Sequence, residues 1–98
     1  MNRVAVISAI LEQPNLCQQE FNQVISSFQG IVKGRMGIPM PEENMAVISL
    51  VVISSTDEIN SLTGRLGRLE HVTVKTSISK KPANKKSIAN QEKQAKEK

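Results

Sequence analysis

Two continuously apolar, β-branched runs most constrain the fold of this chain: "RVAVISAIL" at residues 3–11 and "MAVISLVVIS" at residues 45–54. Short runs rich in valine and isoleucine are typical of strands that are buried on both faces. Residues 31–38 and 71–78 alternate in part between apolar and charged or polar side chains, which indicates strands with one charged side. The sequence therefore predicts four strands, of which the first and third are the most hydrophobic.

Two segments between these strands carry apolar residues at helical spacing. Asn15 precedes the first segment and Ser55 or Thr56 the second, and we expect these residues to cap the helices, with Glu58 as the capping-box acid. The apolar stripes are Cys17, Phe21, Val24 and Phe28 in the first helix, and Ile59, Leu62, Leu66 and Leu69 in the second.

The resulting order is β-α-β-β-α-β, which predicts an α+β protein with a ferredoxin-like sandwich. In this topology two helices cover one face of a four-stranded antiparallel sheet, and the first and third strands lie in its centre. The central position suits the two strands that are apolar on both faces. We assign residues 1–79 to this domain and residues 80–98 to a separate tail.

The net charge of +4 is concentrated in that tail. Residues 80–98 contain seven lysines and two glutamates, for a charge of +5, whereas residues 1–79 carry −1. The tail has one large apolar residue, Ile88, so we expect it to be disordered. Two roles stay open for it: a solubilising tail, or salt-dependent contact with nucleic-acid phosphates. It contains no aromatic residue and no arginine, so base stacking is not supported.

The helix-free face of the predicted sheet is the strongest physical indication of a partner. We expect this face to present an apolar set, with Lys33, Arg35 and Lys75 around it. Burying five large aliphatic side chains contributes about 10 kcal/mol, comparable to the stability of a small domain. A second copy is therefore expected to cover the face, giving a dimer or tetramer joined by the sheet face or by edge strands; the alternative is cover by the tail or a loop. Whichever parity faces the helices, the other face is expected to show apolar sets such as Ala5, Ile7, Ala9 and Leu11 beside Val47, Val51 and Ile53.

The repeated pattern "GRMG" (34–37) and "GRLG" (64–67) raises the question of a phosphate loop. A P-loop lies between a strand and a helix, whereas "GRMG" falls inside a strand, so we exclude that reading. Glycine in a strand usually marks a bulge or a close backbone approach. A ligand or partner approaching Gly34 and Gly37, with Arg35 supplying charge, remains the alternative. Gly64 interrupts the second helix, which predicts close packing against another backbone.

No constellation of residues indicates catalysis or metal binding. Cys17 and His71 are the only cysteine and histidine, and neither has a partner nearby in the sequence. We therefore expect no enzyme activity, no metal and no cofactor. No segment resembles a signal peptide, and no apolar run reaches the length of about 20 residues that spans a membrane, so a cytoplasmic protein is expected.

The segments "GRMGIP", "MAVISLVV" and "DEINSLTGRLGRLEHVTVKTSISK" together resemble the iron-only hydrogenase system regulator family, over residues 3–80. That family is similar in fold to ACT domains and to the ligand-binding domain of nickel-responsive regulators. Those relatives associate through their sheets and bind small effectors at or near subunit interfaces. The long lysine-rich tail departs from the compact family pattern.

The resemblance implies a non-catalytic, oligomeric sensing module, described as a transcriptional regulator, that binds a small effector at a subunit interface. Two alternatives remain: a nucleic-acid-associated protein acting through its tail, and a ligand-free structural partner in hydrogenase maturation. The motif positions expected to shape the interface or an effector pocket are Gly34, Arg35, Met36, Gly37, Ile38, Pro39, Asn60, Gly64, Gly67 and Lys75.

Overall fold

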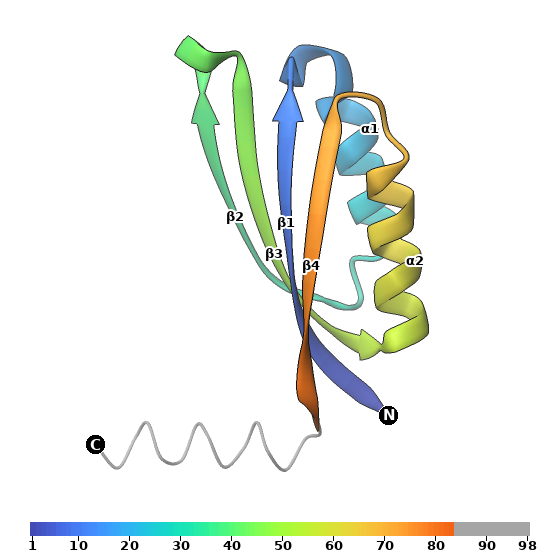
Figure 1. The fold of residues 1–98 in the computed structure, drawn as a ribbon. Helices are drawn as coiled ribbons and strands as arrows, with labels where there is room; N and C mark the ends of the chain where they lie inside the picture. The colour runs from blue at the N-terminus through green and yellow to red at the C-terminus, as the bar shows by residue number, and fades with distance from the viewer. Residues whose placement is uncertain (84–98) are drawn as a thin grey trace, which may run out of the picture.

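The computed structural model describes residues 1–83 and has the expected ferredoxin-like α+β fold. The sheet is antiparallel with the strand order β2-β3-β1-β4, so the two most hydrophobic strands are central. Both helices lie on one face of this sheet, and the other face has no covering layer (Figure 1). The elements in chain order are β1 (Asn2–Glu12), α1 (Pro14–Ser27), β2 (Val32–Met40), the 3-10 turn η1 (Pro41–Glu43), β3 (Met45–Ser55), α2 (Thr56–Gly67) and β4 (Val72–Ala83).

The core lies between the sheet and the two helices. From Ala5 to Leu11 every second side chain of β1 is buried, and each pairs with a β3 residue that points to the same face: Ile7 pairs with Leu50, and Ala9 pairs with Ile48. The helices add one stripe each to this aliphatic core, and Phe21 is its only fully buried aromatic side chain. The buried stripe residues are Cys17, Phe21, Val24 and Ile25 in α1 and Ile59, Leu62 and Leu66 in α2.

The register corrects our expectation for the composition of the helix-free face. We expected Ala5, Ile7, Ala9 and Leu11 to lie beside Val47, Val51 and Ile53, but these two sets are on opposite faces. Val6 is the residue that pairs with Val51, and Ile10 pairs with Val47. Because successive side chains of a strand point to opposite faces, this register puts Val6 and Ile10 on the helix-free face and Ile7 and Ala9 on the other. The helix-free face is still apolar, and we call its exposed large hydrophobic residues the open-face set: Val6, Ile10, Met36, Ile38, Met40 and Val51.

A β-bulge in β2 decides which way its side chains point. Val32 pairs with Val52, but the register then shifts, and Gly34 pairs with Val51. The extra residue, Lys33, reverses the alternation. Arg35 therefore faces the helices and does not border the open face, and Val32 does not share a face with Met36 as expected. The register shift lies beside Gly34, as expected for a glycine inside a strand, whereas Gly37 pairs regularly with Ile48.

The two helix starts agree only in part with the expected caps. Helix α1 begins earlier than predicted: Gln13 is the N-cap, without a side-chain hydrogen bond, and Pro14 is the first helical residue. Proline suits this position because its fixed φ is helical and it has no N–H to satisfy. In α2 the Ser55 hydroxyl accepts from the Glu58 N–H as expected. The Glu58 carboxylate, however, accepts from the Ser54 hydroxyl.

Strand β4 continues four residues beyond the expected domain boundary at Ser79. Pro82 and Ala83 pair with Arg3 and Asn2 of β1, and the Arg3 guanidinium donates to the carbonyls of Ser79 and Lys80. The remainder of the expected tail, residues 84–98, lies outside the described residues. Among the helices of residues 1–83, none combines the length and the hydrophobicity needed to cross a membrane.

Candidate functional site

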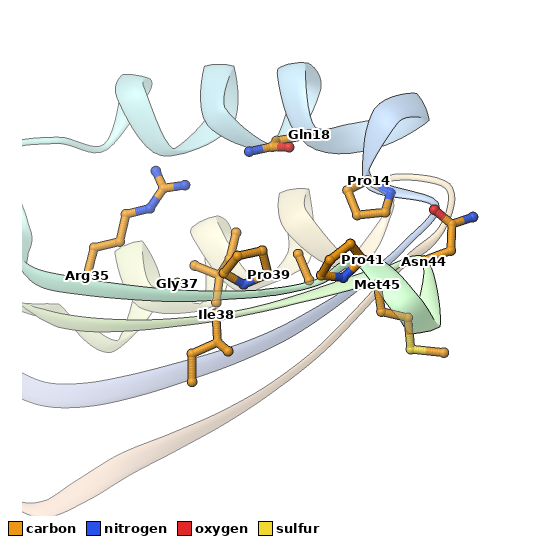
Figure 2. A pocket seen from close by; sticks show the side chains of 11 residues that line it. Pro14, Gln18, Arg35, Gly37, Ile38, Pro39, Pro41, Asn44 and Met45 are labelled. Carbon is orange, nitrogen blue, oxygen red and sulfur yellow. The ribbon is translucent and has the colours of Figure 1, made fainter.

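A cavity of about 370 Å³ lies between the edge strand β2 and the first turns of α1. In Figure 2 the Arg35 side chain rises from β2 and the Gln18 side chain descends from α1 into the same space. The side chain of Ile38 points the other way, so this residue forms wall mainly through its backbone. The floor comes from Gly37 and Pro39 of β2 and from Ile48 of β3.

The space exists because of the bulge and because of Gly37. The bulge turns Arg35, Gly37 and Pro39 toward the helices. A Cβ atom added to Gly37 would stand 3.9 Å from Cγ1 of Ile48, an ordinary van der Waals contact, so a methyl group would fit there and occupy part of the cavity. The glycine thus keeps the floor of the cavity low without being required by backbone conformation.

The end of the cavity is closed by two turns that are tied together. The Gln13 N–H donates to the Asn44 carbonyl across 2.9 Å, which links the start of α1 to the β2–β3 turn. Both residues have left-handed backbones, with φ of 56° and 53°. Pro14 follows Gln13 in the first turn and Pro41 precedes Asn44 in the second; both have restricted φ angles and line the cavity. The end wall is therefore rigid for a surface site.

Arg35 supplies the only charged side chain of the cavity wall. Its Nη2 donates to Oδ1 of Asn22 in α1 across 2.8 Å. Within residues 1–83 this is the one hydrogen bond of the guanidinium, and no carboxylate lines the cavity. Glu42 and Glu43 lie in the neighbouring turn η1 but are exposed and do not contribute to the wall.

The structure brings together four of the ten residues that the sequence singled out. Arg35, Gly37, Ile38 and Pro39 line the cavity. Met36 has the opposite parity, is 63% exposed and belongs to the open-face set.

The remaining five candidates lie elsewhere. Gly34 and Lys75 face away from the helices, since they pair with Val51 and Ser8. In α2, Asn60 is exposed and Gly64 has only the end of the Arg68 side chain nearby, at 3.9 Å, so no backbone in the described chain explains it. A Cβ atom on Gly67 would stand 3.3 Å from Cγ2 of Val74, which makes this glycine a packing residue between α2 and β4.

Comparison with known proteins gives the family of the chain. The family model described as "TM1266-like: Iron-only hydrogenase system regulator, putative" matches residues 3–76. The chain belongs to the TM1266-like family. Among solved structures, the uncharacterized protein TM1266 from Thermotoga maritima is 32% identical, with a TM-score of 0.78, and the match covers 82% of this chain and all of that one. A search of curated proteins gives no match. The resemblance seen in the sequence is confirmed.

The matched region of this TM1266-like chain contains the whole cavity, including residues that sequence reasoning missed. Pro14, Gln18 and Asn44 had no recognisable motif, and Asn22 was simply a polar position on α1. The expected helix start at Asn15 placed Pro14 outside α1, which hid its role. These residues are recognised as part of a site only in the folded structure, where α1 lies next to β2.

A second, more polar cavity of about 540 Å³ lies on the other side of α1 in this TM1266-like fold. It is bordered by Cys17 and Glu20 of α1 and by Arg68 and His71 near the end of α2. Burial, and secondarily the charge of Glu20, raise the pKa of the Cys17 thiol. In the part of the chain that the structure describes, no group of three or more histidine, cysteine, aspartate or glutamate side chains is placed to hold a metal ion.

Proposed function

We propose that this TM1266-like chain is a non-catalytic sensing module of the iron-only hydrogenase system that binds a small effector between β2 and α1. The observation that carries the proposal is the cavity of about 370 Å³ built by Arg35, Gly37 and Pro39, part of the "GRMGIP" segment. A cavity in this size range, with mostly apolar walls and a few polar groups, has the usual composition of a small-molecule site.

Rigid walls favour a binding site over an incidental gap. The turns at Gln13 and Asn44 are joined by a backbone hydrogen bond, and Arg35 is held by Asn22. A preorganised wall lowers the ordering cost of binding. The effector would contact β2 in the sheet layer and α1 in the helix layer. Its binding would therefore restrain these two layers relative to each other.

We further propose that a second copy of this chain covers the open-face set. Val6 and Val51 lie side by side at its centre, and each is 39% exposed. Strands of 11 residues at about 3.3 Å per residue, four abreast at about 4.8 Å, give a face of about 700 Å². Such an area approaches the roughly 800 Å² that each partner of a standard interface buries.

Charge also favours a copy of the same chain as the occupant. Lys75 pairs with Ser8 on the open face. Glu12 is next to the buried residue Leu11 in β1, so its side chain points to the opposite side, which is the open face. In a two-fold interface, residues away from the axis meet different residues of the other copy, and each such contact occurs twice. The face carries both signs of charge at the rim of an apolar centre, so opposite charges can meet when two copies pair.

DNA contact is not part of the proposal. In the described residues α1 and α2 are separated by β2 and β3, so they do not form a helix-turn-helix. If a mobility shift with duplex DNA appears and is lost when residues 84–98 are deleted, the tail-based alternative gains over the effector-sensing role.

A ligand screen with matched variants tests the effector site. We expect compounds from a library of small metabolites to raise the melting temperature and to perturb the amide signals of α1 and β2. Gly37→Ala occupies part of the cavity floor and should weaken these effects. Gly30→Ala is the control, since a Cβ atom there meets nothing within 4 Å. Stabilisation that is the same in both variants, or absent throughout, would refute the site and favour a ligand-free structural role.

Sedimentation at micromolar concentration tests the proposed assembly. The wild-type chain should sediment as a dimer or a larger oligomer, and Val51→Lys should convert it to a folded monomer. Ser61→Lys introduces the same charge on the exposed surface of α2 and should leave the assembly intact. A monomeric wild-type protein would contradict the proposal.

A further inference from the structure

We infer that the effector of this cavity is a monocarboxylate with a short apolar body and no positive charge. The inference rests on the proposed function and adds the chemical class of the ligand. It follows from three properties of the wall: its single charged group, the hydrogen-bond donors of that group that have no partner in residues 1–83, and the apolar surface of the remaining wall.

The charge of the wall selects for one negative charge. Among residues 1–83, Arg35 is the only ionisable residue that lines the cavity, and an arginine side chain carries a positive charge. The contact with Asn22 is to a neutral amide, so it positions the guanidinium without neutralising it. Among residues 1–83, no carboxylate lines the cavity beside this guanidinium, so a bound anion would be its counter-charge.

The donor geometry of Arg35 suits a carboxylate. A guanidinium has five N–H donors in a planar fork, and the bond to Asn22 occupies one donor on Nη2. The remaining donors can form the paired hydrogen bonds that arginine makes with a carboxylate. A phosphate group carries more charge than a carboxylate, and proteins normally bind it with several cations or with a cluster of backbone N–H groups. The described part of this wall offers a single arginine, which suits a carboxylate better.

The rest of the wall suits an apolar body. Pro14, Pro39, Pro41, Ala46 and Ile48 all line the cavity. Buried apolar surface contributes about 25 cal/mol for each Å² removed from water, so a branched alkyl group gains from this wall. The cavity volume of about 370 Å³ lies at the low end of the range for small-molecule sites, so the ligand is small.

The wall also selects against amino acids. A bound α-ammonium group needs a carboxylate or several carbonyl oxygens, and within the described residues 1–83 no aspartate or glutamate side chain lines this cavity. The neutral amides of Gln18 and Asn44 can accept hydrogen bonds through their carbonyl oxygens but cannot neutralise a charge. Burying an ammonium group beside the Arg35 guanidinium would add like-charge repulsion.

Four matched probes test this class directly: 4-methylpentanoate, its amide 4-methylpentanamide, leucine and inorganic phosphate. Leucine differs from 4-methylpentanoate by its α-ammonium group, and the amide differs by its lack of charge. In titrations of the full chain followed by calorimetry and amide NMR, 4-methylpentanoate should bind saturably and shift signals of α1 and β2. The amide, leucine and phosphate should bind more weakly by about tenfold or more.

Two variants assign the binding to the proposed group. Arg35→Gln should weaken 4-methylpentanoate by about tenfold or more while leaving the weaker affinity for the amide unchanged. Arg68→Gln removes an exposed arginine outside this cavity and should have no effect. Because Arg35 is exposed, both variants should fold, which circular dichroism would show.

The outcomes separate this inference from the proposed function. If the amide or leucine binds as tightly as 4-methylpentanoate, and Gly37→Ala weakens that binding, the site is a binding site but the assignment of a monocarboxylate is wrong. If 4-methylpentanoate and shorter monocarboxylates fail to bind at millimolar concentration while another library compound does, the assignment is again overturned. If nothing binds and Gly37→Ala has no effect, both proposals fail.

Discussion

Arg35 of β2 and Asn22 of α1 are joined by a hydrogen bond of 2.8 Å from Nη2 to Oδ1. This bond crosses the gap between the edge strand and the helix layer, at the wall of the cavity. Helix α1 is not part of the sheet, so this side-chain contact is what ties the Arg35 guanidinium to the helix layer.

We predict that Asn22→Ala weakens ligand binding more than it weakens the fold. The variant leaves the charge of Arg35 in place but releases the guanidinium, so the affinity for 4-methylpentanoate should fall by about two- to fivefold through lost preorganisation. The free energy of unfolding should fall by less than about 1 kcal/mol, because the lost bond is exposed. Calorimetry and urea denaturation measure the two effects, with Gln23→Ala as the control; an unchanged affinity would show that the bond does not position Arg35.

The two glycines of α2 should respond in opposite ways to substitution. Gly64→Ala should stabilise the protein by up to about 1 kcal/mol, because alanine favours helix and the new Cβ meets only the flexible Arg68 side chain at 3.9 Å. Gly67→Val should destabilise it by about 1–3 kcal/mol, because even a Cβ stands 3.3 Å from Val74. Urea denaturation measures both, and loss of stability in Gly64→Ala would point to a close neighbour supplied by the assembly.

Neighbouring residues on β3 should separate folding from self-association. Leu50 is fully buried beneath the helices, so Leu50→Ala should lower the free energy of unfolding by about 2–5 kcal/mol. Val51 faces the other way and is partly exposed, so Val51→Ala should change the stability of the isolated subunit little. It should instead weaken the oligomer, seen as dissociation at higher protein concentration in sedimentation. An oligomer unaffected by Val51→Ala would argue against the open face as the interface.

Cys17 predicts a loss of stability at alkaline pH. Burial and the nearby charge of Glu20 raise the pKa of its thiol in the folded state. The folded state therefore keeps this proton to higher pH than the unfolded chain does. The stabilisation is complete below the pKa of the unfolded state and is lost as pH rises through the folded pKa.

Urea denaturation across the alkaline range measures this effect. The decline in unfolding free energy should be shallower in Cys17→Ala, which removes the titrating group. In Glu20→Gln the decline should begin at the same pH, because the unfolded state sets its start. It should end at lower pH and be smaller in total than in the wild type, because removing the Glu20 charge brings the folded pKa of Cys17 closer to its ordinary value. An identical pH profile in all three proteins would contradict the assignment to Cys17.

Much of the fold follows from patterns that are local in the sequence. The β-branched runs of β1 and β3 and the stripes of α1 and α2 predicted six elements in the correct order and a sheet with the two apolar strands in its centre. These patterns are informative because strand and helix periods are short-range properties of the backbone. The Ser55 cap was predictable for the same reason.

The site depended on pairing between segments that are distant in the sequence. Arg35 is a polar residue in an alternating strand, and only the one-residue bulge at Lys33, fixed by pairing with β3, turns it toward α1. The same holds for the open face, where the register of β1 against β3 decided that Val6 and not Ile7 is exposed. The sequence by itself determined which elements form; the tertiary structure decided which faces meet, because facing parity changes with a shift of a single residue.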